Sequence, residues 1–170
     1  MADLIRAAAS SDDYRYFAEL IREYVAWCRE RYTHDSRFID STFDHQSLDR
    51  ELDQLELSYG PPRGRAFLSL RGDEVTGGVA YRRLTDDICE MKRLYVRRQF
   101  HGSGTGSALC SRVVAQARRD GFSLMRLDTA NLLHEAIALY RSIGFVECAP
   151  YITYPENIMP YIMFMEMRLK

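Results

Sequence analysis

The sequence predicts a single α/β domain over residues 1–170, with a mixed central sheet flanked by helices. Its length is typical of one domain that can bury a sizeable core. Helical periodicity in the N-terminal third gives way to alternating strand patterns, and the rest of the chain alternates between helices and strands. A glycine-rich segment, 97–106, stands where a predicted strand gives way to a predicted helix.

The N-terminal third is predicted to be mainly helical. A short edge strand is expected over 3–8, followed by a helix from about residue 10 to residue 31 in which apolar residues recur every three or four positions. The segment 32–46 mixes polar and aromatic residues, so we expect a loop or a short helix there. A second helix is expected at about 47–57, and Gly60-Pro61-Pro62 ends it.

The middle of the chain predicts an antiparallel meander. Strands are expected over 65–70, 75–84 and 88–96, joined by short polar turns. The adjacent Gly77 and Gly78 indicate a bulge or a close approach of something else to the backbone. Simple alternation in the third strand predicts that one face carries Glu90, Lys92, Leu94 and Val96.

The C-terminal part continues with alternating helices and strands. A helix is expected over 107–119, a strand over 123–129, a helix at about 132–142 and further strands over 145–149 and 161–168. The aromatic residues near the C-terminus are expected to lie mostly in strand and core, although Tyr154 and the Tyr32–Phe43 segment could line a substrate pocket.

Composition limits the classes of function. The formal net charge is −1 and the pI is near 6.4, which argues against a general nucleic-acid binder. No apolar run is long enough for a membrane span or a secretory signal, so no membrane association and a cytoplasmic location are expected. The four cysteines are far apart and the histidines show no ligand spacing, so no metal site is expected.

The glycine-rich segment predicts an anion site. Three glycines before a helix expose backbone N–H groups, the helix dipole points the same way, and Arg97 and Arg98 add positive charge. A P-loop is excluded because no lysine follows Gly106. A dinucleotide site is disfavoured, because too few residues follow for that fold and the preceding strand is too polar to be buried on both faces.

Two motifs together resemble one family. Gln99-Phe100-His101-Gly102-Ser103-Gly104 matches the Q/R-x-x-G-x-G/A motif of the GNAT superfamily of N-acetyltransferases. The later segment 136–145 (AIALYRSIGF) is similar to the A-x-x-L-Y-x-x-x-G-F signature of the same superfamily. The resemblance covers about residues 65–149 and implies an acyl-CoA N-acyltransferase fold that binds acetyl-CoA as co-substrate.

The resemblance also implies roles for particular residues. The loop amides of Gln99, Phe100, His101, Gly102, Ser103, Gly104, Thr105 and Gly106 would bind the pyrophosphate of coenzyme A. Backbone groups of Leu94, Tyr95 and Val96 would meet the pantetheine arm, and Asn131 would contact it from the next helix. Tyr140 would protonate the leaving thiolate, and Glu90 is the candidate general base, acting directly or through water.

The chemistry agrees with these residue types. Aminolysis of a thioester needs a polarised carbonyl, a neutral amine and a proton for the leaving sulfur. A phenol stays protonated at neutral pH, whereas an alkylamine with a pKa of about 10.4 is mostly charged, so removal of its proton costs about 4.6 kcal/mol at pH 7. We therefore expect transfer of an acetyl group from acetyl-CoA to a primary amine by direct attack.

Two other functions stay open at this level. A non-catalytic sensor of acyl-CoA would keep the loop and tolerate loss of Tyr140, and a nucleotide-dependent oxidoreductase would need Asp128 on a ribose. The acceptor is expected to be a small-molecule or peptide amine whose identity the sequence does not give. The C-terminal strand could support a homodimer.

Overall fold

The computed structural model describes residues 3–170 apart from Thr33 and Asp35. The described strands form one mixed sheet in the order β1-β2-β3-β4-β5-β7-β6. They are β1 (Leu4–Ala7), β2 (Gly64–Arg71), β3 (Glu74–Arg83), β4 (Ile88–Val96), β5 (Leu124–Ala130), β6 (Val146–Glu147) and β7 (Ile162–Arg168). The helices are α1 (Ser11–Arg31), α2 (Ser36–His45), α3 (Leu48–Asp53), α4 (Leu55–Tyr59), α5 (Thr105–Arg119) and α6 (His134–Ile143).

The sheet is antiparallel except at its centre. Strands β1 to β4 pair antiparallel in sequence, which confirms the predicted meander. Strand β4 pairs in parallel with β5, and β7 lies antiparallel between β5 and β6. The parallel step requires a crossover connection, and α5 supplies it.

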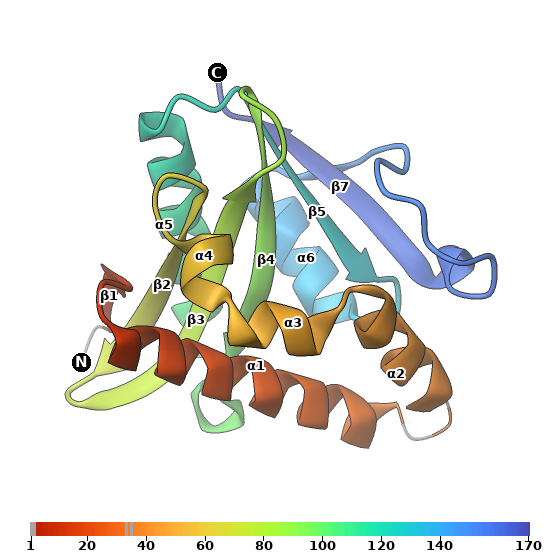
Figure 1. Cartoon of the computed structure of the whole chain (residues 1–170), viewed down its shortest axis with the longest axis horizontal. Helices are drawn as coiled ribbons and strands as arrows, with labels where there is room; N and C mark the ends of the chain where they lie inside the picture. Colours follow the sequence, from red (N-terminus) through yellow and green to blue (C-terminus); the bar gives the residue numbers. More distant parts are fainter. Residues whose placement is uncertain (1–2, 33, 35) are drawn as a thin grey trace.

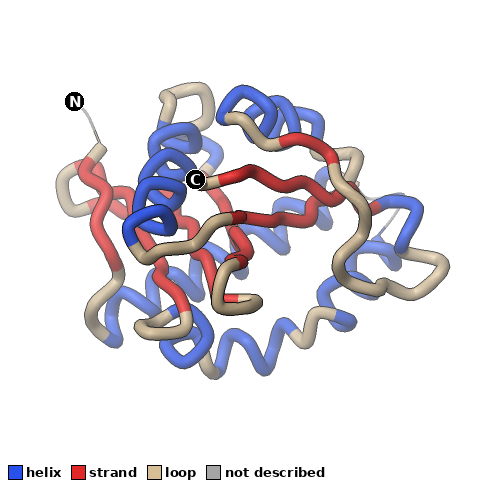
Figure 2. Tube along the Cα trace, turned by 90° about the horizontal axis from the view of Figure 1, so that it is seen from above, coloured by secondary structure: helices blue, strands red, loops and turns tan. Residues whose placement is uncertain are grey.

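Helices cover both faces of the sheet (Figures 1 and 2). Residues of α5 and α6 pack with strand residues in one buried cluster, which includes Leu109, Val113 and Tyr140. Residues of α1 and α4 form a second cluster on the other face, which includes Phe17 and Tyr59. The molecule therefore has three layers, with the sheet between two sets of helices.

The glycine pair in β3 has both of the predicted functions. The β2–β3 register shifts between Ser69, opposite Gly77, and Leu70, opposite Val75, so β3 has one extra residue beside the glycine pair. A Cβ atom at Gly78 would lie 2.9 Å from Leu20 Cδ1 and 3.0 Å from Phe17 Cδ2 of α1. Glycine is thus needed for the close packing of α1 on the sheet.

Helix α1 begins at a capping box. The backbone N–H of Asp13 donates to Ser10 Oγ, and Asp13 Oδ2 accepts from the backbone N–H groups of Ala9 and Ser10. The Arg6 guanidinium of β1 also donates to both Asp13 oxygens, at 2.8 and 2.6 Å. These contacts satisfy N–H groups that a helix start leaves unpaired and link α1 to the sheet edge.

Some predicted boundaries were wrong. The helix expected at about 47–57 is two short helices, α3 and α4, that are separated at Gln54. The segment 32–46 contains helix α2, while the part of that prediction that falls on Thr33 and Asp35 lies outside the described residues. The strand expected over 145–149 is only the two-residue β6. No described helix combines the length and apolarity needed to cross a membrane.

Candidate active site

The site lies where the central strands separate. Strands β4 and β5 pair only over three residues, from Ile88 and Leu124 to Glu90 and Arg126. Beyond this point the two strands diverge, as Figure 1 shows. A cavity of about 400 Å³ occupies the opening, lined by the second halves of β4 and β5, the glycine-rich loop, α6, and α1 and α2.

A bulge in β4 shapes this cavity. Arg93 has φ +60°, a left-handed conformation that is unusual for a residue with a side chain. It lies where the register shifts, between Lys92 opposite Ala80 and Tyr95 opposite Gly78. Beyond Glu90, strand β4 also has backbone groups that do not pair with β5.

The bulge also corrects the predicted face of β4. Leu94 and Val96 pack with Cys89 and Met91 in the cluster of α5 and α6, whereas Tyr95 lies in the cluster of α1. The expected alternation, with Leu94 and Val96 on the same face as Glu90, is wrong beyond Arg93. One extra residue in the strand reverses the side-chain order.

Buried contacts hold the bulge in place. The Arg93 guanidinium donates to both Glu51 oxygens, at 2.8 and 2.9 Å, and the two side chains are 4% and 7% exposed. Glu51 also accepts from the Tyr59 hydroxyl at 2.7 Å. Burial opposes ionisation, but Arg93 and Tyr59 keep the pKa of the Glu51 carboxyl below its usual value. The short helices α3 and α4 thus supply the partners of Arg93.

The glycine-rich loop is built from turns that require glycine. After a 3₁₀ turn at Arg98–Phe100, Gly102 and Gly104 have φ of +76° and +85°, and α5 begins at Thr105. An added Cβ atom at either glycine would meet nothing within 4 Å, so backbone conformation alone requires them. The loop therefore presents the N-terminus of a long helix, which favours an anion.

The two arginines before the loop have other partners than we expected. Arg97 makes a bidentate ion pair with Glu23, with closest contact 2.8 Å, and Arg98 lies 2.9 Å from Glu30. Both glutamates belong to α1. The positive charge expected from these arginines is therefore offset by two glutamates, and the ion pairs link the loop to α1.

Most predicted cofactor residues lie on the cavity. Those that line it are Leu94, Tyr95, Val96, Phe100, His101, Gly102, Gly104, Thr105 and Gly106. Three predicted residues are not among the lining residues. Gln99 Nε2 contacts Glu74, Ser103 Oγ donates to the Phe100 carbonyl, and Asn131 Nδ2 donates to the Pro160 carbonyl.

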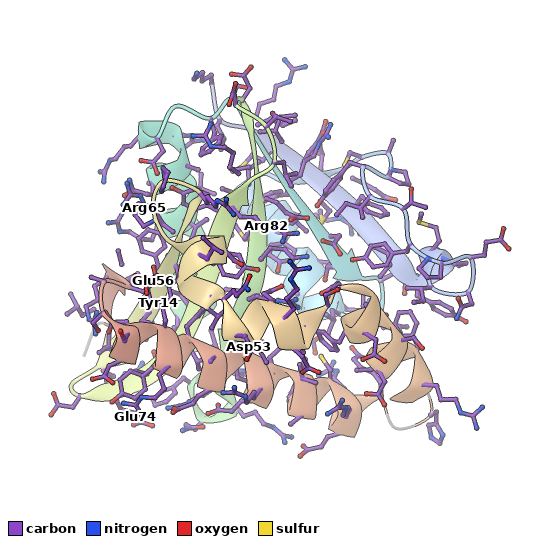
Figure 3. All side chains as sticks on the ribbon, in the orientation of Figure 1. Tyr14, Asp53, Glu56, Arg65, Glu74 and Arg82 are labelled. Carbon is purple, nitrogen blue, oxygen red and sulfur yellow. The ribbon has the colours of Figure 1, made fainter. Side chains whose placement is uncertain are left out.

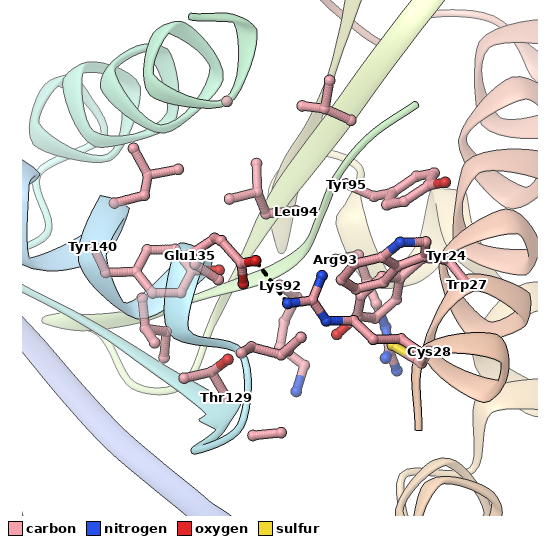
Figure 4. Close-up of a pocket in the computed structure, with 18 of the residues that line it drawn as sticks. Tyr24, Trp27, Cys28, Lys92, Arg93, Leu94, Tyr95, Thr129, Glu135 and Tyr140 are labelled. Atoms are coloured by element: carbon pink, nitrogen blue, oxygen red, sulfur yellow. Dashed lines mark hydrogen bonds and ion pairs between the residues drawn. The ribbon is translucent and has the colours of Figure 1, made fainter. Parts of the chain in front are cut away.

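Tyr140 faces the cavity from α6. Its side chain is mostly buried and packs edge-on against Phe145, and it lines the opening between the strands (Figure 4). Its hydroxyl has no hydrogen-bond partner among the described residues. Burial raises the pKa of this phenol. The hydroxyl is therefore protonated at neutral pH and available to a ligand.

Glu90 lies behind the cavity wall. Its side chain is fully buried, and its carboxylate accepts from Arg82 Nε at 2.8 Å and from the Tyr151 hydroxyl at 3.0 Å. Arg82 is labelled in Figure 3. Glu90 is not a lining residue, so direct contact with a substrate is not supported by its position. Its predicted role as base stays a prediction.

The sequence analysis missed a second buried charge cluster at the cavity. Lys92 Nζ lies 3.2 Å from Asp128 Oδ1 and 4.0 Å from Glu90 Oε1. Asp128 Oδ2 accepts from the Tyr154 hydroxyl at 2.6 Å. Burial opposes ionisation of Asp128, but Lys92 and Tyr154 keep its pKa below the usual value. Lys92 and Asp128 line the cavity, whereas Tyr154 lies behind Asp128.

An aromatic wall covers the other side of the cavity. It comprises Tyr24, Trp27, Tyr32, Phe38 and Phe43, from α1, α2 and the segment between them. Tyr24 stacks on Trp27, with 6.2 Å between the ring centroids, and contacts Phe43 edge-on, with 6.0 Å between the centroids. Figure 4 places Tyr24 and Trp27 on the side of the opening opposite Tyr140.

Comparison with known proteins agrees with this architecture. Residues 21–145 match the model of the acetyltransferase (GNAT) family. An N-acetyltransferase of Schizosaccharomyces pombe is 33% identical over 168 residues, covering 97% of this chain and 94% of that protein. A crystal structure of an acetyltransferase from Streptococcus agalactiae has a TM-score of 0.75 at 16% identity, with 99% of each chain covered. The yncA protein of Salmonella typhimurium has a TM-score of 0.66 at 24% identity, covering 100% of this chain and 95% of that one.

The mixed sheet, with helices on both faces and an opening between β4 and β5, is an acyl-CoA N-acyltransferase fold. The chain belongs to the GNAT acetyltransferase family, and it is an N-acetyltransferase.

Proposed function

We propose that the protein transfers an acetyl group from acetyl-CoA to a primary amine by direct attack. The observation that carries the proposal is one cavity that contains the glycine-rich loop, the unpaired edge of β4 and the free hydroxyl of Tyr140. The structure of Salmonella typhimurium yncA contains its cofactor acetyl-CoA, which supports acetyl-CoA as the co-substrate here.

The loop and β4 would bind different parts of the co-substrate. The N–H groups at the start of α5 fit the pyrophosphate, because oriented amides and a helix N-terminus favour negative charge. The backbone of Leu94–Val96 fits the amide groups of the pantetheine arm as an added strand would. A backbone N–H next to the bulge would donate to the thioester carbonyl, where negative charge develops during attack.

The reaction balances with one proton donor. The amine lone pair forms the C–N bond, the carbonyl re-forms, and the C–S bond breaks with its electron pair on sulfur. Tyr140 gives its proton to the sulfur, the product nitrogen loses one to solvent, and the phenol is restored by uptake of a proton. Because the pKa of Tyr140 is raised, it stays protonated until needed.

Glu90 fits a positioning role better than direct proton transfer. Its two oxygens already accept hydrogen bonds from Arg82 and Tyr151, and Lys92 lies between it and Asp128. We propose that Glu90 orients Lys92 and, through it, Asp128 at the cavity surface.

Replacement of Tyr140 tests the enzyme proposal. With acetyl-CoA and a panel of amines, Tyr140→Phe should lower kcat by about 100-fold, the usual effect of losing a general acid. The dissociation constant for acetyl-CoA should change less than about threefold, because the ring remains. Thiol release and calorimetry measure the two quantities. Full turnover by Tyr140→Phe would remove its role as the acid.

Thermal melting separates the two other functions. Acetyl-CoA should raise the melting temperature and NADH should not. Stabilisation by NADH alone would favour the oxidoreductase. Stabilisation by acetyl-CoA with no thiol release from any amine would favour the acyl-CoA sensor.

A further inference from the structure

The charged groups that line the cavity are already paired with one another or with their neighbours. The cationic lining residues among those described are Arg31, Lys92 and Arg93. Arg93 is held by Glu51, and Lys92 by Asp128 and Glu90. Arg31 Nη2 lies 2.6 Å from Glu135 Oε1, the pair that Figure 4 marks at Glu135. An acceptor carboxylate would therefore have no uncommitted cation to bind.

The acidic residues that line the cavity are also paired. The two acidic lining residues in the described part of the chain are Asp128 and Glu135. Asp128 accepts from Lys92 and Tyr154, and Glu135 pairs with Arg31. The imidazole of His101 donates through Nε2 to the Val96 carbonyl at 2.7 Å. A second ammonium group, such as that of a diamine, would likewise find no uncommitted carboxylate.

The acceptor side of the cavity is mainly apolar, with Thr42 and Gln46 as uncharged polar lining residues. Tyr24, Trp27, Phe38 and Phe43 supply ring surfaces, and Ile39 adds aliphatic surface. The cavity volume of about 400 Å³ must also contain the end of the pantetheine arm and the acetyl group. The acceptor therefore has only part of this volume, next to the ring surfaces of the wall.

We propose that the acceptor amine is a weakly basic α-amino group on an uncharged, apolar or aromatic body, as in an amino-acid amide or the N-terminus of a peptide. This inference rests on the proposed acetyl transfer. A cavity with no uncommitted charge favours the neutral amine, which is also the nucleophile. At pH 7 about 1 in 8 α-amino groups is neutral, compared with about 1 in 2,500 alkylamines.

A matched series of amines tests this choice. Phenylalanine amide, 2-phenylethylamine and phenylalanine share one ring and differ in amine basicity and in charge. At pH 7, kcat/KM should be at least tenfold higher for phenylalanine amide than for 2-phenylethylamine. When the rates are expressed per neutral amine, phenylalanine should still be at least tenfold worse than its amide, because its carboxylate has no partner. The dipeptide amide Phe-Ala-NH₂ distinguishes a peptide from a small molecule as the source of the α-amino group.

A gain of charge gives an independent test. Thr42 lines the cavity from α2, beside the aromatic wall. Thr42→Lys should raise the ratio of kcat/KM for phenylalanine to that for its amide at least fivefold, by giving the carboxylate a partner. Thr42→Met has similar length without charge and should leave this ratio unchanged.

The possible failures are distinct. The inference would be overturned if kcat/KM per neutral amine were equal for phenylalanine and its amide, or if a diamine such as putrescine were preferred. Either result would leave the proposed acetyl transfer intact. Failure to acetylate any amine, by an enzyme that acetyl-CoA stabilises, would contradict the proposed function and the inference with it.

Discussion

At the scale of residues, the site depends on the left-handed conformation of Arg93. A bulge residue with φ +60° is strained, and the bidentate pair with buried Glu51 offsets this cost. Glycine would adopt the conformation freely but would leave the Glu51 carboxylate buried without its ion-pair partner. An arginine in this place both holds the bulge of β4 at the cavity and neutralises a buried acid.

Glu90 provides a test at the same scale. Because its carboxylate is buried with Arg82 and Tyr151, Glu90→Gln should lower the free energy of unfolding by about 1–3 kcal/mol. If Glu90 only orients Lys92, kcat should fall less than about fivefold and the ascending limb of the pH–rate profile should remain. Urea denaturation and kinetics across pH measure both. If kcat instead falls about 100-fold and the ascending limb disappears, Glu90 is the base.

At the scale of elements, the glycine-rich loop can be separated into its stability and binding contributions. Gly104→Ala places a side chain at φ +85° and should cost about 1 kcal/mol of stability. In the proposed complex the new methyl group would lie among the amides that meet the pyrophosphate, so KM for acetyl-CoA should rise at least tenfold.

Gly72 is the matched control for this prediction. It lies in the β2–β3 turn with φ +61°, and an added Cβ atom there also meets nothing within 4 Å. Gly72→Ala should therefore cost a similar free energy of unfolding and leave KM for acetyl-CoA unchanged. Equal KM values for the two variants would contradict a phosphate site at the loop.

The start of α1 makes the stability pH-dependent. Hydrogen bonds from Arg6 lower the pKa of the Asp13 carboxyl, against the opposing effect of burial and with help from the N–H groups of Ala9 and Ser10. A folded-state pKa below the unfolded value of about 3.8 adds stability above that pH, and this part is lost as the pH falls below it.

We therefore expect Asp13→Asn to cost about 2 kcal/mol near pH 7, and the difference from the natural protein to shrink between about pH 4 and pH 2. Urea titrations at several pH values measure this difference in the free energy of unfolding. Asp12→Asn, at an exposed neighbouring position, should leave the pH dependence as it is. A difference that is constant with pH would show that the Asp13 charge does not matter.

The elements also show what sequence reasoning can and cannot predict. The meander, the glycine-rich loop and the helix of Tyr140 follow from local periodicity and from turn residues, which act over a few positions. The bulge at Arg93 depends on Glu51, more than forty positions earlier in the chain. No local pattern contains that contact, so the face of Leu94 and Val96 was predicted wrongly.

At the scale of the whole molecule, the charges of the site depend on which strands become neighbours. Parallel pairing of β4 with β5 brings Lys92 next to Asp128, and the segment before β7 brings Tyr154 behind it. Each of these residues looks like an ordinary strand or loop residue in the sequence. The motifs predicted most of the loop and β4 residues that line the cavity, whereas the aromatic wall and the buried charges required the arrangement of α1, α2 and both central strands.

The ion pairs between α1 and the glycine-rich loop have a consequence for kinetics. Arg97 with Glu23 and Arg98 with Glu30 tie the loop to the helix that carries Tyr24 and Trp27. Acetyl-CoA on the loop would hold α1 in place and so complete the amine site, which predicts a compulsory order with acetyl-CoA first and free coenzyme A last. Coenzyme A should then inhibit competitively against acetyl-CoA and non-competitively against the amine. Random addition would show that the two halves of the site form independently.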